Sequence, residues 1–283
     1  MIFLLILNFF FMGASDSVLV MDKEVTDFQS AVSITTDAKE NIYVLDAGSN
    51  QVIKYGNYLD YKKRNGKQGW AEGQFDSPTS IDGSSGLDIF ITDGKNRRVQ
   101  RLDLELNPVT SLKTNLIDFP ADLQFNTPVA TLVLNSKELY VIDGDNNRII
   151  VYKDGRTPTE IFGDYRSGKG QLERPVKILK DDKNFVYVLD KEQKAIIRFD
   201  NLGNYISRIE IKDLENFAIK GSRMYLFNGK EIIKYDLDKN SIIEKKIFPV
   251  SFTRKKIRDI YVLNGEKYLL LGKNALSLWV ENN

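Results

Sequence analysis

The sequence predicts an all-β protein, and three observations lead to this fold class. Six segments share one shape, in which two short runs rich in apolar residues are joined by a polar turn. The turns recur at intervals of 38 to 50 residues. Tyr (13) and Phe (16) are plentiful while Pro is only 7, and aromatic residues fit pleated, half-buried sheets. A period of about 45 residues with several short strands in each unit is typical of a β-propeller.

Each unit is recognised by its strand pair. The first strand leads into an acidic, amide or glycine residue at the turn, and the second strand leaves the turn. The turn positions are Asp46, Asp93, Asp143, Asp190, Asn228 and Gly272. The six pairs are NIYVLDAGSNQVIKY (41–55), LDIFITDGKNRRVQRLD (87–103), ELYVIDGDNNRIIVYKD (138–154), FVYVLDKEQKAIIRFD (185–200), RMYLFNGKEIIKYDL (223–237) and KYLLLGKNALSLWV (267–280).

Two further strands complete most units. One strand precedes each pair, as in SAVSITTD (30–37) and PVKILKD (175–181), and a fourth strand follows, as in YISRIEI (205–211). The last unit lacks a fourth strand, whereas SVLVMDK (17–23) is a spare strand before the first unit. We therefore expect a six-bladed β-propeller with four antiparallel strands in each blade. The N-terminal strand would join the last blade and close the ring, which removes two open sheet edges.

The units resemble NHL-repeat β-propellers. That family carries a Gly-Gln-Phe-x-x-Pro approach to the first strand, and then a strand, Asp, two turn residues, Asn, any residue, Arg and an apolar residue. The match is close in units two to four and weaker elsewhere, since Ser49 and Gln51 replace Asn and Arg in the first unit. The resemblance implies the fold and leaves the activity open. The matching segments are GQFDSP (73–78), GQLERP (170–175), DGKNRRV (93–99) and DGDNNRI (143–149).

The repeated cluster of acid, glycine, amide and arginine is interpreted as a device for making turns. Gly accepts positive φ, and Asp and Asn side chains hydrogen-bond to backbone amides two residues further on. Arg98 and Arg148 begin the next strand and are expected to bridge to an acid or carbonyl of a neighbouring blade. The residues assigned to this structural role are Asp46, Asp93, Asn96, Asp143, Asn146 and Asp190.

A cation site is the alternative for one of these turns. Asp143, Asp145 and Asn147 alternate as at the start of a calcium loop. The sixth and twelfth positions of such a loop should be Gly and Glu, and here they are Arg148 and Asp154. These residues are therefore weak metal candidates.

A nucleotide site is the alternative for a second loop. GDYRSGKG (163–170) has the G-x-x-x-x-G-K spacing of a phosphate loop, but Gly170 stands where Ser or Thr should follow. No helix is expected after it to hold a phosphate. We expect no cofactor.

Two absences limit the chemistry. The chain has no Cys and no His, which excludes disulfides, thiolate nucleophiles, His-based triads and zinc sites of Cys or His type. Lys+Arg (40) and Asp+Glu (39) leave a net charge of +1, whereas nucleic-acid binding needs a strongly basic surface. Any catalysis must use carboxylates, Lys, Arg, Tyr, Ser or Thr, or a hard cation bound by oxygen.

The first fifteen residues, MIFLLILNFFFMGAS, differ from the rest. An apolar run is followed by Gly13, Ala14 and Ser15, which predicts a secretory signal cleaved near Ser15. The run is shorter than the roughly 20 residues that span a bilayer. No Lys or Arg precedes it, and an uncleaved anchor or a buried strand are the alternatives. We expect a secreted or periplasmic protein with a single domain over residues 16–283 and no transmembrane span in the mature chain.

We expect this domain to be a binding or scaffold module rather than an enzyme. One face would present its approach loops and turns to a protein, peptide or glycan, and the molecule would be a monomer without a nucleic-acid partner. Aromatic and Arg side chains are common interface anchors. The side chains that the turns do not need are Trp70, Lys95, Arg97, Asp145, Asn147, Tyr165 and Arg174.

The alternative is a calcium-dependent hydrolase of the lactonase or esterase type. By resemblance, six-bladed propellers of this kind hold the ion in the central channel with Glu, Asp and Asn. The first strands of this chain present mostly Val, Ile, Thr and Ser, and Asp82 is the nearest carboxylate candidate. NHL-type lyases that use zinc need His, which is absent. We assign no catalytic residue from the sequence.

Overall fold

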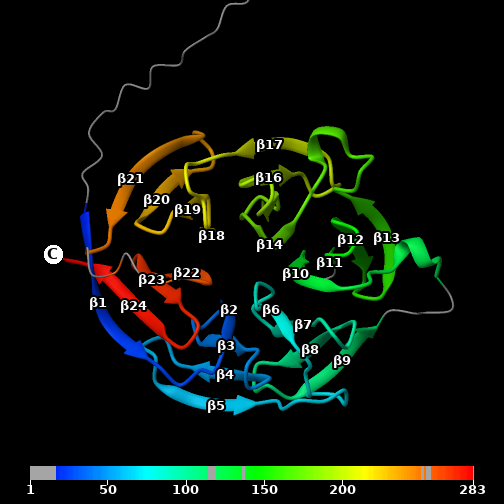
Figure 1. Cartoon of the computed structure of the whole chain (residues 1–283), viewed down its shortest axis with the longest axis horizontal. Helices are drawn as coiled ribbons and strands as arrows, with labels where there is room; N and C mark the ends of the chain where they lie inside the picture. The colour runs from blue at the N-terminus through cyan, green and yellow to red at the C-terminus, as the bar shows by residue number, and fades with distance from the viewer. Residues whose placement is uncertain (1–16, 114–118, 136–137, 250–251, 253–255, 283) are drawn as a thin grey trace, which may run out of the picture.

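A computed structural model shows the chain as a ring of β-sheets around a central axis (Figure 1). It describes residues 17–113, 119–135, 138–249, 252 and 256–282. The two named helices in this part are short 3-10 turns, η1 (Ala121–Leu123) and η2 (Gly168–Gly170). The segment predicted as a signal, residues 1–15, lies outside the described residues, so the signal and the location that it implies stay predictions. None of the described helices has the length and apolar character needed to cross a membrane.

Four of the sheets have four antiparallel strands each, in sequence order from the axis outward. The first contains β2 (Ala31–Thr36), β3 (Ile42–Asp46), β4 (Gln51–Tyr55) and β5 (Tyr61–Asn65). The second contains β6 (Pro78–Asp82), β7 (Asp88–Asp93), β8 (Arg98–Asp103) and β9 (Pro108–Lys113). The third contains β10 (Pro128–Leu134), β11 (Glu138–Asp143), β12 (Arg148–Lys153) and β13 (Thr157–Phe162). The fourth contains β14 (Pro175–Lys180), β15 (Val186–Asp190), β16 (Ala195–Phe199) and β17 (Tyr205–Ile209).

The remaining eight strands form one sheet in the order β18-β19-β20-β21-β1-β24-β23-β22. The N-terminal strand β1 pairs with β24 in antiparallel fashion along most of its length, which confirms the prediction that it joins the last unit. It also pairs with β21 in parallel at two positions, Ser17 with Lys246 and Val18 with Ile247. The strands are β1 (Ser17–Val25), β18 (Asn216–Lys220), β19 (Arg223–Phe227), β20 (Glu231–Asp236), β21 (Ser241–Ile247), β22 (Asp259–Leu263), β23 (Lys267–Leu271) and β24 (Leu276–Glu281).

This arrangement corrects the prediction of six separate blades. The described chain has four four-stranded sheets and one eight-stranded sheet. The reason is that β1 is hydrogen-bonded on both of its edges, so the strands on its two sides belong to one sheet. The all-β propeller itself is confirmed.

Burial explains why the inner strands have continuous apolar sequences. A strand such as β3 is buried at all five positions because sheets pack against both of its faces. The outermost strand β5 has only exposed or half-buried residues and the sequence YKKRN. The core is accordingly divided into clusters that lie between neighbouring sheets, such as the cluster of β10–β12 with β14–β16.

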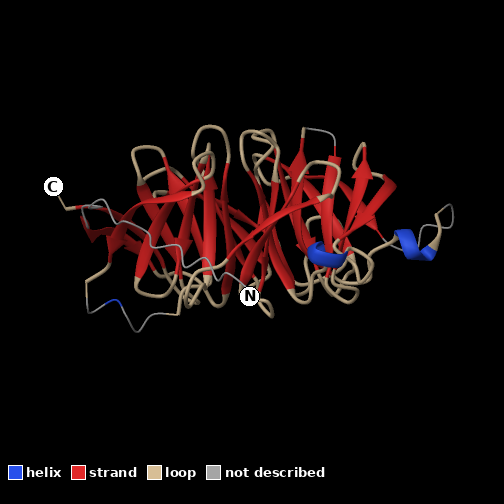
Figure 2. Ribbon diagram, turned by 90° about the horizontal axis from the view of Figure 1, so that it is seen from above, coloured by secondary structure: helices blue, strands red, loops and turns tan. Residues whose placement is uncertain are grey.

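The innermost strands surround the axis. β2, β6, β10, β14, β18 and β22 each contact the next in this cyclic order. Three of them begin with Pro, at Pro78, Pro128 and Pro175, which fits a residue that lacks a ladder donor. Loops cover both ends of the strands (Figure 2). The axis is therefore reached from two loop-covered faces.

Candidate functional site

The turn aspartates join each turn to the loop that approaches the same sheet. Asp93 is fully buried and accepts hydrogen bonds from the Asp76 backbone N–H (2.8 Å) and from Arg98 Nε (2.9 Å). Arg98 also donates to backbone carbonyls of the approach loop, including those of Trp70 and Gln74. The carboxylate thus reaches 17 residues back along the chain, and the arginine acts within its own unit instead of bridging to a neighbouring blade.

The equivalent aspartates make the same kind of contact. Asp46 accepts from the backbone N–H groups of Gln29 (2.9 Å) and Ser30 (2.7 Å). Asp190 accepts from those of Glu173 (2.7 Å) and Arg174 (3.2 Å). Each carboxylate closes an approach loop by accepting backbone amides that have no strand partner.

Asp143 and Asp145, the weak metal candidates, are each engaged by donors of the fold. The Asp143 carboxylate receives the Asn126 backbone N–H, Asn146 Nδ2 and Arg148 Nε. Asp145 instead accepts from Thr127 Oγ1 at 2.8 Å. Because the two carboxylates serve different donors, they are not brought together on a common ligand.

The seven side chains expected on a binding face lie on loops and turns. Trp70 is 83% exposed and Tyr165 is 79% exposed. Four of the others contact polar groups of nearby loops: the Lys95 ammonium lies 3.6 Å from the Asp76 carboxylate, and the Arg174 guanidinium lies 3.7 Å from the Glu192 carboxylate. Arg97 Nε donates to the Asn126 carbonyl (3.1 Å), and the Asp145 carboxylate accepts from the Thr127 hydroxyl. Asn147 has a φ of 48° in its turn. They come from the loops and turns of three different sheets.

The channel contains an ion pair that the sequence analysis did not single out. Lys177 on β14 reaches across to β22, where its Nζ lies 2.5 Å from Asp259 Oδ1, and it also donates to Asn216 Oδ1 on β18 (2.9 Å). Asp259 Oδ2 accepts the Ile34 backbone N–H of β2 at 2.9 Å. These contacts link the four inner strands β14, β18, β22 and β2 around the axis.

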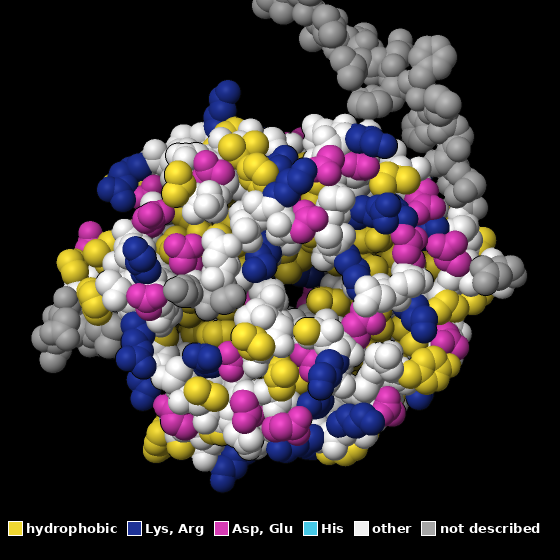
Figure 3. Space-filling view, turned by 180° about the vertical axis from the view of Figure 1, so that it is seen from behind, with side chains coloured by type: hydrophobic (Ala, Val, Ile, Leu, Met, Phe, Trp, Pro, Cys, Tyr) yellow, Lys and Arg dark blue, Asp and Glu magenta, His cyan; other side chains and the backbone are white. Residues whose placement is uncertain are grey.

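A second polar cluster occupies the channel at the carboxyl ends of the inner strands. Asp82 Oδ2 on β6 accepts the Val133 backbone N–H of β10 at 2.9 Å, and Lys180 Nζ on β14 donates to the Val133 carbonyl at 2.9 Å. Tyr261 on β22 accepts a hydrogen bond from Thr36 Oγ1 at 2.8 Å. Seen from behind, the centre of the ring is hollowed, with Lys or Arg side chains beside the hollow (Figure 3).

The pKa values of the acid and the lysine in this cluster are shifted toward one another. Burial raises the pKa of the Asp82 carboxyl, although hydrogen bonds from Ser84 and Val133 act against the shift. Burial lowers the pKa of the Lys180 ammonium, although the charge of Asp82 acts against it. Burial also raises the pKa of Tyr261. A lysine that loses its proton more easily beside a carboxyl that keeps its own is a common feature of acid–base sites.

Of these residues, only Asp82 was predicted from the sequence. A signal for Lys177 and Lys180 was present, because PVKILK places two lysines inside a strand that must line the axis. Tyr261 carried no such signal, since tyrosine is common throughout these strands.

The channel residues do not fit a calcium ion. Calcium takes 6–8 oxygen ligands. Asp259 is neutralised by the Lys177 ammonium, and Asp82 is held by Ser84 and the Val133 amide. Within the described ranges, no group of three or more His, Cys, Asp or Glu side chains is placed to hold a metal ion.

Comparisons with known proteins place the fold. No protein-family model and no curated protein matches the chain. Among the solved structures that it resembles is a streptogramin B lyase, with 15% identity over 89% of this chain and 79% of that chain and a TM-score of 0.61. Virginiamycin B lyase from Staphylococcus aureus gives 13% identity over 93% and 99% of the two chains and a TM-score of 0.62. A gluconolactonase from Xanthomonas campestris gives 12% identity over 95% and 91% and a TM-score of 0.65.

These neighbours correct the expected function. The prediction of a scaffold without catalytic activity is wrong in the light of them, since the neighbours are named as lyases and a lactonase and favour the enzymatic alternative. At such low identity the likeness shows the fold alone. By its fold, the chain is a β-propeller of the kind that these enzymes share.

Proposed function

We propose that this protein is a propeller hydrolase that opens ester or lactone bonds in its central channel. The observation that carries the proposal is the pairing of Lys180, whose pKa is lowered, with Asp82, whose pKa is raised, around the Val133 peptide. The fold of the gluconolactonase and the lyases supports a channel site of this kind by analogy.

The cluster supplies the groups that ester hydrolysis needs. In its amine form, Lys180 takes a proton from a water molecule, whose oxygen attacks the carbonyl carbon. Tyr261 accepts from Thr36, so its own phenol proton remains to donate to the carbonyl oxygen as negative charge develops there. The C–O bond then breaks, and the departing alkoxide takes the proton from the Lys180 ammonium. Asp82 is a positioning residue, because it accepts from the N–H of Val133, the residue whose carbonyl fixes Lys180.

The absence of histidine favours hydrolysis over the lyase reaction as the proposed activity. One neighbour is a virginiamycin B lyase variant described as catalytically inactive after a single histidine-to-alanine change. This chain has no His at any position. A reaction that depends on that side chain has no counterpart here, whereas a lysine base needs none.

We also propose a finer description of the ring. The eight-stranded sheet consists of two four-strand halves, β18–β21 and β22–β24 with β1, and the strand pairing that joins the halves is the two parallel pairs of β1 with β21. Counting each half as a blade makes six, in agreement with the cyclic contacts of the six inner strands. The GQFDSP and GQLERP segments and the turn motifs support an NHL-like origin of these blades.

The decisive experiment is an activity screen with a lysine variant. Residues 16–283 are assayed against p-nitrophenyl acetate and butyrate and against five- and six-membered lactones, including gluconolactone. Lys180→Met is expected to lower kcat/KM by about 100-fold or more, because the base is lost. Wild-type activity should rise with pH as Lys180 is deprotonated, below the ordinary lysine pKa of about 10.4. Lys220→Met is the matched control. Lys220 lies on β18, the inner strand next to β14, and forms an ion pair with Glu40.

Two outcomes would refute the proposal. One is a folded wild-type protein that hydrolyses none of these substrates. The other is a Lys180→Met protein that keeps the wild-type rate and pH profile. Circular dichroism and a thermal melt of each variant separate a catalytic effect from loss of the fold.

A further inference from the structure

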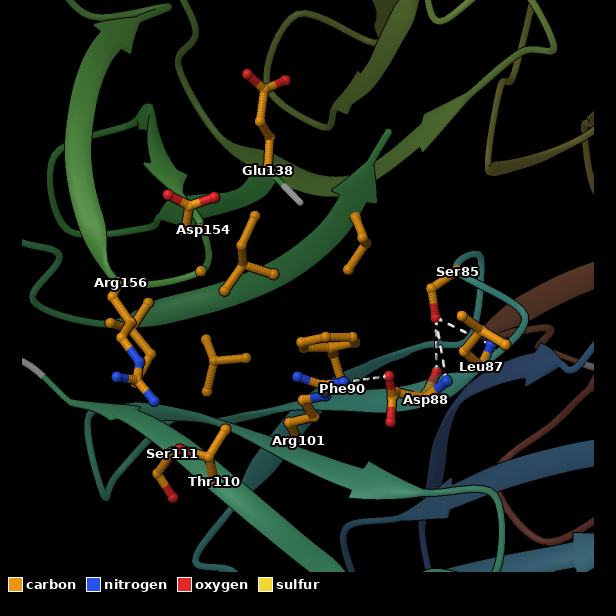
Figure 4. A pocket seen from close by; sticks show the side chains of 15 residues that line it. Ser85, Leu87, Asp88, Phe90, Arg101, Thr110, Ser111, Glu138, Asp154 and Arg156 are labelled. Carbon is orange, nitrogen blue, oxygen red and sulfur yellow. Dashed lines mark hydrogen bonds and ion pairs between the residues drawn. The ribbon is translucent and has the colours of Figure 1, made fainter. Parts of the chain in front are cut away.

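A pocket away from the channel opens between the second and third sheets. It has a volume of about 490 Å³, within the usual range for a small-molecule site. Apolar side chains from both sheets line it, with arginines, acids and hydroxyl groups around them (Figure 4). The apolar residues are Leu87, Phe90, Val99, Leu112, Val133 and Leu139.

At the position where the pocket opens, the third sheet lacks a buried apolar side chain that the first two sheets have. In the first two sheets, the turn between the third and fourth strands carries Leu59 and Leu106, which are 2% and 0% exposed. Leu106 packs in one buried cluster with Tyr43 and Leu45 of the preceding sheet. The strand pairing Tyr55–Tyr61, Leu102–Pro108 and Tyr152–Pro158 makes Arg156 the equivalent residue of the third sheet.

A second substitution opens the same cleft. Tyr43 and Tyr140 occupy the same register of their sheets and donate their hydroxyls to carbonyls of the next sheet's turn, those of Leu104 (3.0 Å) and Asn201 (2.9 Å). The residue at this register in the second sheet is Phe90, which has no hydroxyl to reach the turn at Asp154. A side-chain carbon added at Gly155 in that turn would meet no atom within 4 Å.

Two arginines, Arg101 and Arg156, and three acids, Asp88, Glu138 and Asp154, line the pocket, and Arg156 is the cation that is open to an anionic ligand. Arg101 and Asp88 form an ion pair at 2.7 Å, and the Arg101 Nε is buried without a hydrogen-bond partner. Arg156 is exposed and forms no ion pair among the described residues. It points from the β12–β13 turn across the pocket toward Thr110 and Ser111 of β9 (Figure 4). The carboxylate of Glu138 points away from the centre of the pocket (Figure 4).

We propose that this pocket binds a small amphipathic carboxylate. The carboxylate would pair with Arg156, the hydroxyl of Thr110 would supply a further donor, and the apolar body would lie on Val99, Leu112 and Leu139. The pocket shares Val133 with the channel cluster, but Asp82, Lys180 and Tyr261 do not line it, so its failure would leave the proposed hydrolase untouched.

Octanoate is the probe, and octylamine and octanol are its head-group controls. Titration calorimetry on residues 16–283 is expected to show octanoate binding and markedly weaker binding of the other two. Arg156→Leu restores the residue type of the turns in the first two sheets and should weaken octanoate binding by about tenfold or more, since a charge-assisted contact and the pocket volume are both lost. Arg223→Leu, which changes an exposed arginine of β19 on another sheet, should bind like the wild type.

Phe90→Tyr is a second variant that keeps the fold, because tyrosine occupies this register in the first and third sheets. Its hydroxyl should bond to the β12–β13 turn and also reduce octanoate affinity. The proposal is overturned if octanoate does not bind at millimolar concentration, if octylamine binds equally well, or if octanoate binds both pocket variants as tightly as the wild type.

Discussion

At the residue scale, buried aspartates hold the repeated turns in place by accepting hydrogen bonds. Asp46 is 1% exposed and receives the Gln29 and Ser30 amides, the Gly48 amide and the Ser49 hydroxyl. Burial by itself raises the pKa of this carboxyl, but the hydrogen bonds together hold the pKa below its ordinary value. The charged form is therefore the one that the folded protein stabilises.

Asp46→Asn should lower the free energy of unfolding by about 1–3 kcal/mol at pH 7, because the amide nitrogen of Asn replaces one of the two carboxylate oxygens that accept hydrogen bonds. The folded pKa lies below the unfolded value of about 3.9, so the folded state binds fewer protons between the two. The stability that Asp46 contributes is present above pH about 4 and is lost as the pH falls through the folded pKa. Urea denaturation at pH 7 and pH 3 measures this.

The gap between wild type and Asp46→Asn should accordingly narrow at pH 3. Asp182→Asn, at an exposed position, is the control and should change stability by no more than about 0.5 kcal/mol. An equal gap at both pH values would contradict the assigned role of the Asp46 charge.

At the element scale, one sheet is fastened to the next by side chains that cross the cleft between them. The Tyr140 hydroxyl donates to the Asn201 carbonyl in the turn between β16 and β17. The Tyr43 hydroxyl makes the corresponding contact with Leu104. Where this register holds Phe90 and the turn holds Arg156, a pocket is found instead.

Tyr140→Phe should lower the free energy of unfolding by about 1 kcal/mol, because the Asn201 carbonyl loses its donor while the ring keeps its packing. Tyr205→Phe is the matched control, since Tyr205 is partly exposed and no hydrogen bond of its hydroxyl is found in the described part of the chain. Guanidinium denaturation of both variants measures the difference. Equal stability of the two variants would argue against the fastening role.

At the scale of the whole molecule, the two ends of the chain close the ring. β1 and β24 lie side by side (Figure 1), and Leu19 of β1 packs fully buried in one cluster with Phe248 and Trp279. The adjacent Val18 is 49% exposed, as the alternation of a strand requires. Ring closure thus depends on one face of the N-terminal strand.

Leu19→Ala should lower the free energy of unfolding by about 2–5 kcal/mol, because it leaves a cavity in the cluster that joins the ends. Val18→Ala, one residue earlier on the opposite face, should cost less than about 1 kcal/mol. Thermal and guanidinium unfolding of the two variants provide the test. Similar losses for both would mean that the strand does not close the ring as described.

Much of the fold could be predicted because it depends on local patterns that repeat. The strand pairs, the turn residues and the spare N-terminal strand are all visible in the sequence, and β1 joins β24 as expected. The fusion of β21 with β1 could not be predicted, because two parallel backbone pairs leave no side-chain pattern.

The candidate site was less accessible to sequence reasoning. Asp82 was named as a channel carboxylate, but its neighbours Lys180 and Tyr261 lie 98 and 179 positions further along the chain. The pocket depends on Phe90 and Arg156, whose significance appears only when the registers of three sheets are compared.

By itself, the sequence determined an all-β repeat protein without His or Cys chemistry, because residue types and period 2 alternation are local properties. Only the tertiary structure decided which polar side chains meet. Closing the ring brings β6, β10, β14 and β22 to one axis, where burial shifts the pKa values of Asp82 and Lys180. These shifts arise from burial and from distances between strands that are far apart in the chain, so no single segment of the sequence predicts them.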